Sequence, residues 1–246
     1  MEVRHMSEYN QQVYTGGKTL QQYMTSVFTT MAAGLGITAL VAGLGYYNLV
    51  SGGWMYSLVM NGGYSMVSMI AFIVQLVLCF SISRSLTSMN PGRTKGLFLG
   101  YAAITGFTFT VLPLVFGAAT VFTAFAFSAV MYLAAAVIGR FTRVDLSKFS
   151  GIFIGALFAL VLVSILSMFI PSLASSLVIS YAGVLLFLGL TAWDMQRITN
   201  FYYQTQGNDA LSESVSVYGA FELYLDFINI FLYVLRIFGR GSSSRN

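Results

Sequence analysis

The sequence has 246 residues, of which 57% are hydrophobic and only 8% are charged. Soluble domains carry about a quarter charged residues, so this composition excludes an ordinary soluble globular protein, and its hydrophobicity excludes a disordered chain. The net charge of +4 comes from Lys and Arg scattered over short segments, which argues against a nucleic-acid partner and leaves the lipid bilayer as the expected surroundings.

Long apolar segments follow one another along the chain. Residues 1–25 are polar and are expected to form a cytoplasmic tail, residues 26–239 form the predicted transmembrane domain, and residues 240–246 form a short C-terminal tail. A helix needs roughly 20 apolar residues to cross a bilayer, and the segments lack the alternation typical of barrel strands. We therefore predict an all-α membrane protein, a seven-transmembrane-helix bundle with spans at residues 27–50, 64–83, 97–116, 118–139, 152–170, 177–193 and 215–238.

The positions of Lys and Arg predict the orientation of the bundle. Outside the C-terminal region, they fall in the N-terminal tail or after the second, fourth and sixth spans, where Arg197 is read as a loop residue. By the positive-inside rule these segments face the cytoplasm, so the N-terminus is predicted to be cytoplasmic. Segment 215–238 is long enough to cross fully, although Arg236, Arg240 and Arg245 then lie outside; a re-entrant last segment is the alternative.

The first span carries small residues in a repeating pattern. Ala32 and Gly36, and then Ala39 and Gly43, form two small-xxx-small pairs seven residues apart, so all four lie on one face of a helix. Such a face allows another helix to approach closely in a membrane. The pattern makes this face a candidate for helix packing, and chance in a chain with 24 glycines is the alternative.

Few residue types suited to catalysis are present. There is one histidine, His5, in the N-terminal tail, and one cysteine, Cys79, inside an apolar segment. This excludes histidine-based metal sites and Ser-His or Cys-His hydrolases within the membrane. Segment 215–238 contains no lysine, which excludes a retinal-type photoreceptor. We therefore expect neither an enzyme nor a bound cofactor.

Three acidic residues, Asp194, Glu222 and Asp226, lie within or at the edge of the last two predicted spans. A carboxylate at the middle of a membrane costs about 2.5–3.5 kcal/mol and usually faces a cavity or a partner. At roughly 100° per residue, the polar residues of the last span form one stripe. Its members are Tyr218, Glu222, Asp226, Asn229, Tyr233 and Arg236, opposite Leu223, Phe227, Ile230, Phe231 and Val234.

The stripe predicts a central last helix that faces a polar interior. The alternative is that its side chains only hold the bundle together through hydrogen bonds between helices. We expect a functional role for the three carboxyl groups in particular.

Two motifs resemble the transmembrane Bax inhibitor motif family, in its bacterial branch. They are Gly-Leu-Thr-Ala-Trp-Asp-Met-Gln at residues 189–196 and Leu-Tyr-Leu-Asp-Phe-Ile-Asn-Ile-Phe at residues 223–231; Thr-Arg-Val-Asp-Leu-Ser at residues 142–147 is similar as well. The resemblance implies a bundle with the C-terminal helix at its centre. It also implies that Asp194 and Asp226 form a hydrogen-bonded pair that senses pH and gates a calcium leak.

The same resemblance implies auxiliary roles for two arginines. Arg84 fits the family position of an arginine that engages the aspartate pair, and Arg236 fits an arginine near the end of the last helix. Some relatives pair that second arginine with an acid on the second span, where this sequence offers only Gln75. Glu222 is a further departure from the motif.

The expected function is therefore a pH-regulated calcium leak channel in a bacterial inner membrane. Calcium prefers about six to eight oxygen ligands, so Asp194 and Asp226 would hold it transiently, with water, Glu222 and Asn229 supplying further oxygens. Calcium and protons are the expected partners. One alternative is a proton-coupled transporter that uses the same carboxyl groups; another is a non-transporting protein that binds another membrane protein, such as a quality-control protease.

Overall fold

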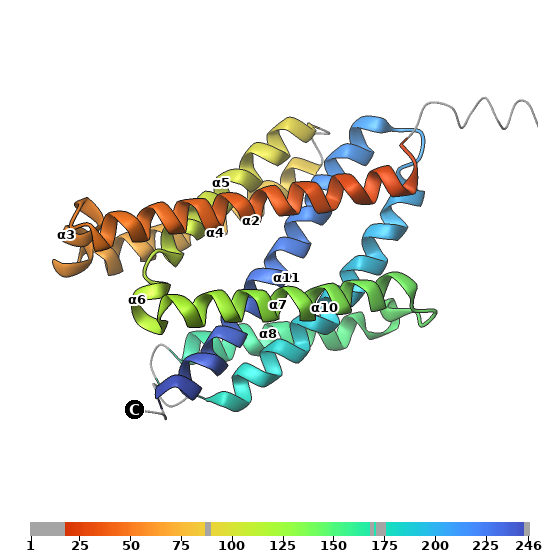
Figure 1. Cartoon of the computed structure of the whole chain (residues 1–246). Coiled ribbons are helices and arrows are strands. Elements are labelled where there is room, and N and C mark those ends of the chain that lie inside the picture. The colour runs from red at the N-terminus through yellow and green to blue at the C-terminus, as the bar shows by residue number, and fades with distance from the viewer. Residues whose placement is uncertain (1–17, 87–89, 168–169, 171–175, 244–246) are drawn as a thin grey trace, which may run out of the picture.

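The computed structural model describes residues 18–86, 90–167, 170 and 176–243, and regular structure in these ranges is helical. Figure 1 shows the helices running back and forth between two ends of the molecule. Most of the predicted N-terminal tail and residues 244–246 lie outside the described residues. The elements are α2 (Leu20–Val50), α3 (Trp54–Met60), α4 (Gly63–Ser85), α5 (Pro91–Phe109), α6 (Leu112–Phe116), α7 (Ala118–Phe141), the 3-10 turn η2 (Leu146–Phe149), α8 (Ser150–Leu166), α10 (Leu177–Gln204) and α11 (Asp209–Ser243).

Local sequence signals explain where several helices begin. Thr19 caps α2 in a reciprocal pair of hydrogen bonds with Gln22, which satisfies two backbone groups at the helix start. Asn90 caps α5 just before Pro91, a residue whose fixed φ suits a first helical position. Because α2 begins at Leu20, the first helix extends into the predicted tail of residues 1–25.

Within the described residues, six helical segments are long and apolar enough to cross a membrane. They are Leu20–Val50, Gly63–Ser85, Pro91–Phe116, Ala118–Phe141, Leu146–Leu166 and Leu177–Gln204. The all-helical membrane architecture predicted from the sequence is thus confirmed. The 35-residue helix α11 is not one of the six, so the seventh crossing stays a prediction.

The third predicted span is interrupted, contrary to the single segment 97–116 expected from its apolar composition. It consists of α5 and the short helix α6, and Pro113 lies in the first turn of α6. Proline has no backbone N–H and cannot continue a preceding helix without a break. Gly117, with φ of +82°, then turns the chain into α7. A single residue separates α6 from α7, so the turn has to be this sharp.

Helix α11 lies among four other helices and organises the core. It packs against α2, α5, α7 and α10, and Figure 1 shows it passing between them. Phe221 and Tyr224 of α11 meet Phe98 and Tyr101 of α5 at ring-centroid distances of 5.1–6.1 Å. The hydroxyl of Thr38 in α2 donates to the carbonyl oxygen of Ala102 at 2.9 Å and lies 2.8 Å from the hydroxyl of Tyr224. These contacts join three helices at one level.

The small-residue face of the first span is not used for packing among the described residues, which favours the alternative that the pattern arose by chance. Ala32, Gly36, Ala39 and Gly43 are all exposed, and a methyl group added at Gly36 or Gly43 would meet nothing within 4 Å. The packed face of α2 instead contains Gly34, which lies against Phe98. A pattern of small residues allows another helix to approach closely, but it does not determine whether a helix packs there.

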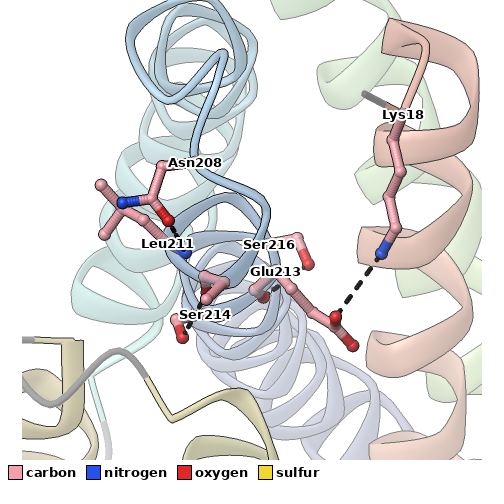
Figure 2. A network of polar contacts seen from close by, with 7 residues as sticks. Lys18, Asn208, Leu211, Glu213, Ser214 and Ser216 are labelled. Carbon is pink, nitrogen blue, oxygen red and sulfur yellow. Dashed lines mark hydrogen bonds and ion pairs between the residues drawn. The ribbon is translucent and has the colours of Figure 1, made fainter. Parts of the chain in front are cut away.

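The two ends of α11 lie at opposite ends of the bundle. At its first turns, Glu213 forms an ion pair of 3.9 Å with Lys18, directly before α2, as Figure 2 shows. In the same network Asn208 accepts a hydrogen bond from the backbone N–H of Leu211. At the other end, Gly239 lies against Phe116 of α6. The helix therefore extends along the full length of the bundle.

Helices α7 and α10 approach each other closely at Gly139, and this contact yields a stability prediction. A Cβ atom at Gly139 would overlap the backbone of Ala192, which cannot move aside as a side chain can. We expect Gly139→Ala to destabilise the protein by about 1–3 kcal/mol through overpacking. The measurement is the thermal midpoint of unfolding in detergent.

The matched control is Gly36→Ala, in the middle of α2 with open space around it. Alanine favours a helix over glycine by roughly 1 kcal/mol, so its midpoint should equal or exceed that of the wild type. Equal midpoints for the two variants would contradict the close approach of α7 and α10.

Candidate ion site between helices α10 and α11

Two aspartates from neighbouring helices are buried at the α10–α11 interface. Asp194 of α10 is 8% exposed and Asp226 of α11 is 5% exposed. The two carboxyl groups are close enough to interact electrostatically, and Asp226 also contacts the side chain of Thr191, one helical turn before Asp194. The structure thus brings together the two residues singled out from the sequence.

A third carboxyl group and one arginine complete an acidic cluster, which we define as Asp194, Arg197, Glu222 and Asp226. The guanidinium of Arg197 forms a hydrogen-bonded ion pair with Glu222, and its Nη2 atom lies 3.5 Å from Oδ1 of Asp194. One guanidinium is therefore shared by carboxylates of two helices. Such charge-assisted contacts are stronger than hydrogen bonds between neutral groups.

The assignment of Arg197 to a loop was wrong. Helix α10 continues to Gln204, eleven residues beyond the predicted end of the span at Trp193. The side chain of Arg197 is 30% exposed and lies against the acids of the α10–α11 interface. The spacing of Arg197 and Asp194 could have indicated this contact. The two residues are three apart, and residues three apart lie on one face of a helix.

Two aromatic rings lie close to the guanidinium group of Arg197. Its central carbon lies 5.1 Å from the ring centroid of Trp193 and 5.6 Å from that of Phe201. These rings belong to the turns before and after Arg197 on the same helix. Rings within about 6 Å of a cation attract it electrostatically, so the rings favour this placement of Arg197.

Several polar atoms of the acidic cluster have no hydrogen-bond partner within the described residues. These are Nε of Arg197, Oε2 of Glu222 and Oδ2 of Asp226. Buried polar atoms without partners are costly, and they are usually satisfied by water or an ion. The acidic cluster therefore has an unused acceptor oxygen on each of its two α11 carboxyl groups, Glu222 and Asp226.

The polar stripe of α11 lies on its less covered side. Tyr218, Glu222 and Asn229 are half-buried and Arg236 is exposed, whereas Asp226 and Tyr233 are buried. The opposite side is the most deeply buried: Leu223, Phe227, Ile230, Phe231 and Val234 are each at most 4% exposed. The expectation of a polar interior therefore needs correction, since the bundle core around α11 is mainly apolar and aromatic.

The remaining predicted residues lie farther along the helices. Asn229 donates a hydrogen bond from its side chain to the carbonyl oxygen of Leu225 at 2.8 Å. Arg84 is exposed at the last turn of α4, and Arg236 lies over the ring of Tyr233 at 5.6 Å. Gln75 donates to the hydroxyl of Thr105 at 2.9 Å. The auxiliary roles of Arg84 and Arg236 stay predictions.

No group of three or more His, Cys, Asp or Glu side chains in the described ranges is arranged to hold a metal ion. Asp194, Glu222 and Asp226 thus do not form a ready-made calcium cage. Transient binding of calcium by Asp194 and Asp226 needs fewer protein ligands than a calcium cage, and it stays a prediction.

A neighbouring glutamine ties α10 to the loop after α7. The side chain of Gln196 donates to the carbonyl oxygen of Val144 at 2.9 Å and accepts from the backbone N–H of Leu146 at 2.8 Å. The motifs at residues 142–147 and 189–196 are therefore in direct contact. This bridge holds the loop beside the turn of α10 that carries Arg197.

The chain is similar to known proteins over nearly its whole length. The model of a family described as "Inhibitor of apoptosis-promoting Bax1" matches residues 20–243. An uncharacterized protein of Deinococcus radiodurans is 37% identical over 230 residues, covering 91% of this chain and 94% of that protein. The inner membrane protein YbhL of Escherichia coli K12 is 37% identical over 222 residues, covering 89% and 92%. An uncharacterized membrane protein of Streptococcus pyogenes is 35% identical, covering 90% and 94%.

The bridge made by Gln196 gives a second stability prediction. Gln196→Met has nearly the same length but leaves the backbone groups of Val144 and Leu146 without their partner. These backbone groups are exposed or only partly buried, so the loss of each hydrogen bond costs about 0.5–1.5 kcal/mol, and the thermal midpoint in detergent should fall. Gln206→Met, at an exposed position after α10, serves as the control and should leave the midpoint unchanged. Equal midpoints for the two variants would contradict a structural role for the bridge.

Proposed function

The chain belongs to the Bax inhibitor-1 family of membrane proteins, and we propose that it is a pH-regulated leak pathway for calcium and similar cations in a bacterial inner membrane. Asp194 and Asp226 gate this pathway between α10 and α11. The observation that carries the proposal is the burial of these two carboxyl groups on adjoining helices, at 8% and 5% exposure, within electrostatic range of each other.

The chemistry of the gate follows from the surroundings of the two aspartates. Two carboxyl groups held close in a medium of low dielectric constant cannot both ionise at little cost, so they share a proton and titrate as a unit. A shared proton joins α10 to α11 through a hydrogen bond. Its loss replaces that bond with repulsion and creates a negative site that attracts a cation.

The polar stripe of α11 provides a route for the cation. Asp226, Asn229 and Arg236 follow one another along one side of the helix over about 15 Å, at 1.5 Å per residue. Asn229 is only partly covered and Arg236 is exposed, and the proposed route requires that water accompany the ion at these positions. A few oxygen ligands supplemented by water favour passage over storage, because calcium held tightly requires about six to eight.

A seventh crossing by α11 belongs to the same proposal. The helix is continuous from Asp209 to Ser243, and its two ends contact Lys18 beside α2 and Phe116 of α6, at opposite ends of the bundle. A re-entrant segment would require a break. With the N-terminus cytoplasmic, the C-terminus then lies outside.

Calcium flux into proteoliposomes tests the gate. Asp226→Asn retains the shape of the side chain but can neither release the proton nor attract the ion. We expect it to reduce the initial flux by about tenfold, equivalent to roughly 1.4 kcal/mol on the barrier, and to abolish the pH response expected of the wild type. Glu213→Gln, an exposed acid on the same helix, should leave the flux unchanged.

Wild-type flux and pH response in Asp226→Asn would overturn the proposal. Saturable movement of another solute driven by a pH gradient would instead indicate the proton-coupled transporter.

Reporter fusions test the topology. A phosphatase that is active only outside the cytoplasm should be active when fused after Asn246. A fluorescent reporter that matures only in the cytoplasm should be dark at the same position and bright at the N-terminus. The reverse result at Asn246 would exclude the full crossing of α11, given a cytoplasmic N-terminus.

A further inference from the structure

Arg197 and Glu222 form a second layer of charge beside the aspartates. Arg197 follows Asp194 by three residues on α10, and Glu222 precedes Asp226 by four residues on α11. Because α10 and α11 are antiparallel neighbours joined by a short turn, both offsets point toward that turn (Figure 1). The Arg197–Glu222 layer thus lies about 5 Å, one helical turn, closer to this end of the bundle.

We propose that this layer is an inner gate of the cation pathway, in which the guanidinium group of Arg197 acts as a tethered cation at the mouth of the aspartate site. Glu222 determines how closely the guanidinium approaches Asp194. The inference rests on the proposed function, because it needs a cation pathway through Asp194 and Asp226. It assigns distinct roles to two residues that the pathway itself does not require.

The contacts of Arg197 indicate competition between two carboxylates. Its guanidinium is paired with Glu222, while Nη2 lies 3.5 Å from Oδ1 of Asp194, just beyond the usual hydrogen-bond range. Glu222 is therefore the preferred partner, and Asp194 is within reach of a small rotation of the side chain. Arg197 carries a permanent positive charge, so it competes with any incoming cation for the same oxygens.

The surroundings of the guanidinium allow such a rotation. Trp193 and Phe201 attract it from the turns on either side without fixing its direction, since cation–π contacts lack the directionality of a bidentate salt bridge. Nε of Arg197 and Oε2 of Glu222 have no hydrogen-bond partner within the described residues. The pair is consequently not fixed by a complete set of hydrogen bonds.

The proposal predicts effects of opposite sign for the two partners. Without the charge of Arg197, the mouth of the aspartate site is open and negative, so cations enter more readily. Without the charge of Glu222, Arg197 loses its competing partner and moves toward Asp194, so cations enter less readily. A pair that only joined α10 to α11 would give effects of the same sign, because either variant breaks the same link.

The experiment measures initial calcium flux into proteoliposomes for Arg197→Gln, Glu222→Gln and the double variant. We expect Arg197→Gln to raise the flux by roughly tenfold, the factor expected for one hydrogen bond to a charged group, and Glu222→Gln to lower it by a similar factor. The double variant should match Arg197→Gln, because Glu222 acts only through Arg197. Arg197→Lys, which keeps the charge, should remain nearer to the wild type than Arg197→Gln.

Glu213→Gln is the matched control, since Glu213 is also a paired acid of α11 but is exposed. Elution as a single species and the thermal midpoint are measured for every variant. Changes of the same sign in Arg197→Gln and Glu222→Gln would overturn the inner gate while leaving the pathway intact. A wild-type protein without calcium flux would overturn the proposed function itself. If Arg197→Gln does not fold, Glu222→Gln decides: reduced flux supports the gate, and equal or higher flux overturns it.

Discussion

The balance of charge between α10 and α11 is the constraint on which the rest of the structure depends. Three carboxyl groups and one guanidinium lie at this interface in a chain whose other surfaces are largely apolar. Charges removed from water are tolerated only when they are paired or reach water. Arg197 pairs with Glu222 and lies near Asp194, which compensates part of the charge. The remaining polar groups lie along the partly covered stripe of α11.

One side of α11 packs in the core of the bundle, and the other side carries the groups of the proposed ion pathway. Its apolar side is almost completely buried and is held by aromatic contacts such as those of Phe221 and Tyr224 with α5. This packing holds the apolar side of the helix, while the contacts of Arg197 hold its polar side against α10. The polar side is therefore able to contain incompletely bonded groups, such as Oδ2 of Asp226, without loss of the fold. A rigid support on one side and unsatisfied acceptors on the other suit an ion pathway.

The sequence predicted the helical membrane architecture and directed attention to Asp194, Glu222 and Asp226, because long apolar segments make rare charges conspicuous. It did not predict contacts between side chains of different helices. Arg197 was counted as a loop residue, since hydropathy falls near Trp193 although the helix continues to Gln204. The exposure of the face containing Gly36 could not be predicted, because small size permits packing but does not require it. The partner of Gln196 lies in a distant loop and depends on the fold as a whole.

The proposed pathway requires that calcium reach the buried aspartates of the α10–α11 interface. The most direct test is modification of the reconstituted protein by dicyclohexylcarbodiimide, a hydrophobic reagent for protonated carboxyl groups, followed by mass spectrometry of the peptides that contain Asp194 and Asp226. We expect these residues to be modified, calcium flux to be lost in parallel, and added calcium to slow the modification. Modification that proceeds at the same rate with and without calcium, or that leaves the flux intact, would contradict the proposed pathway.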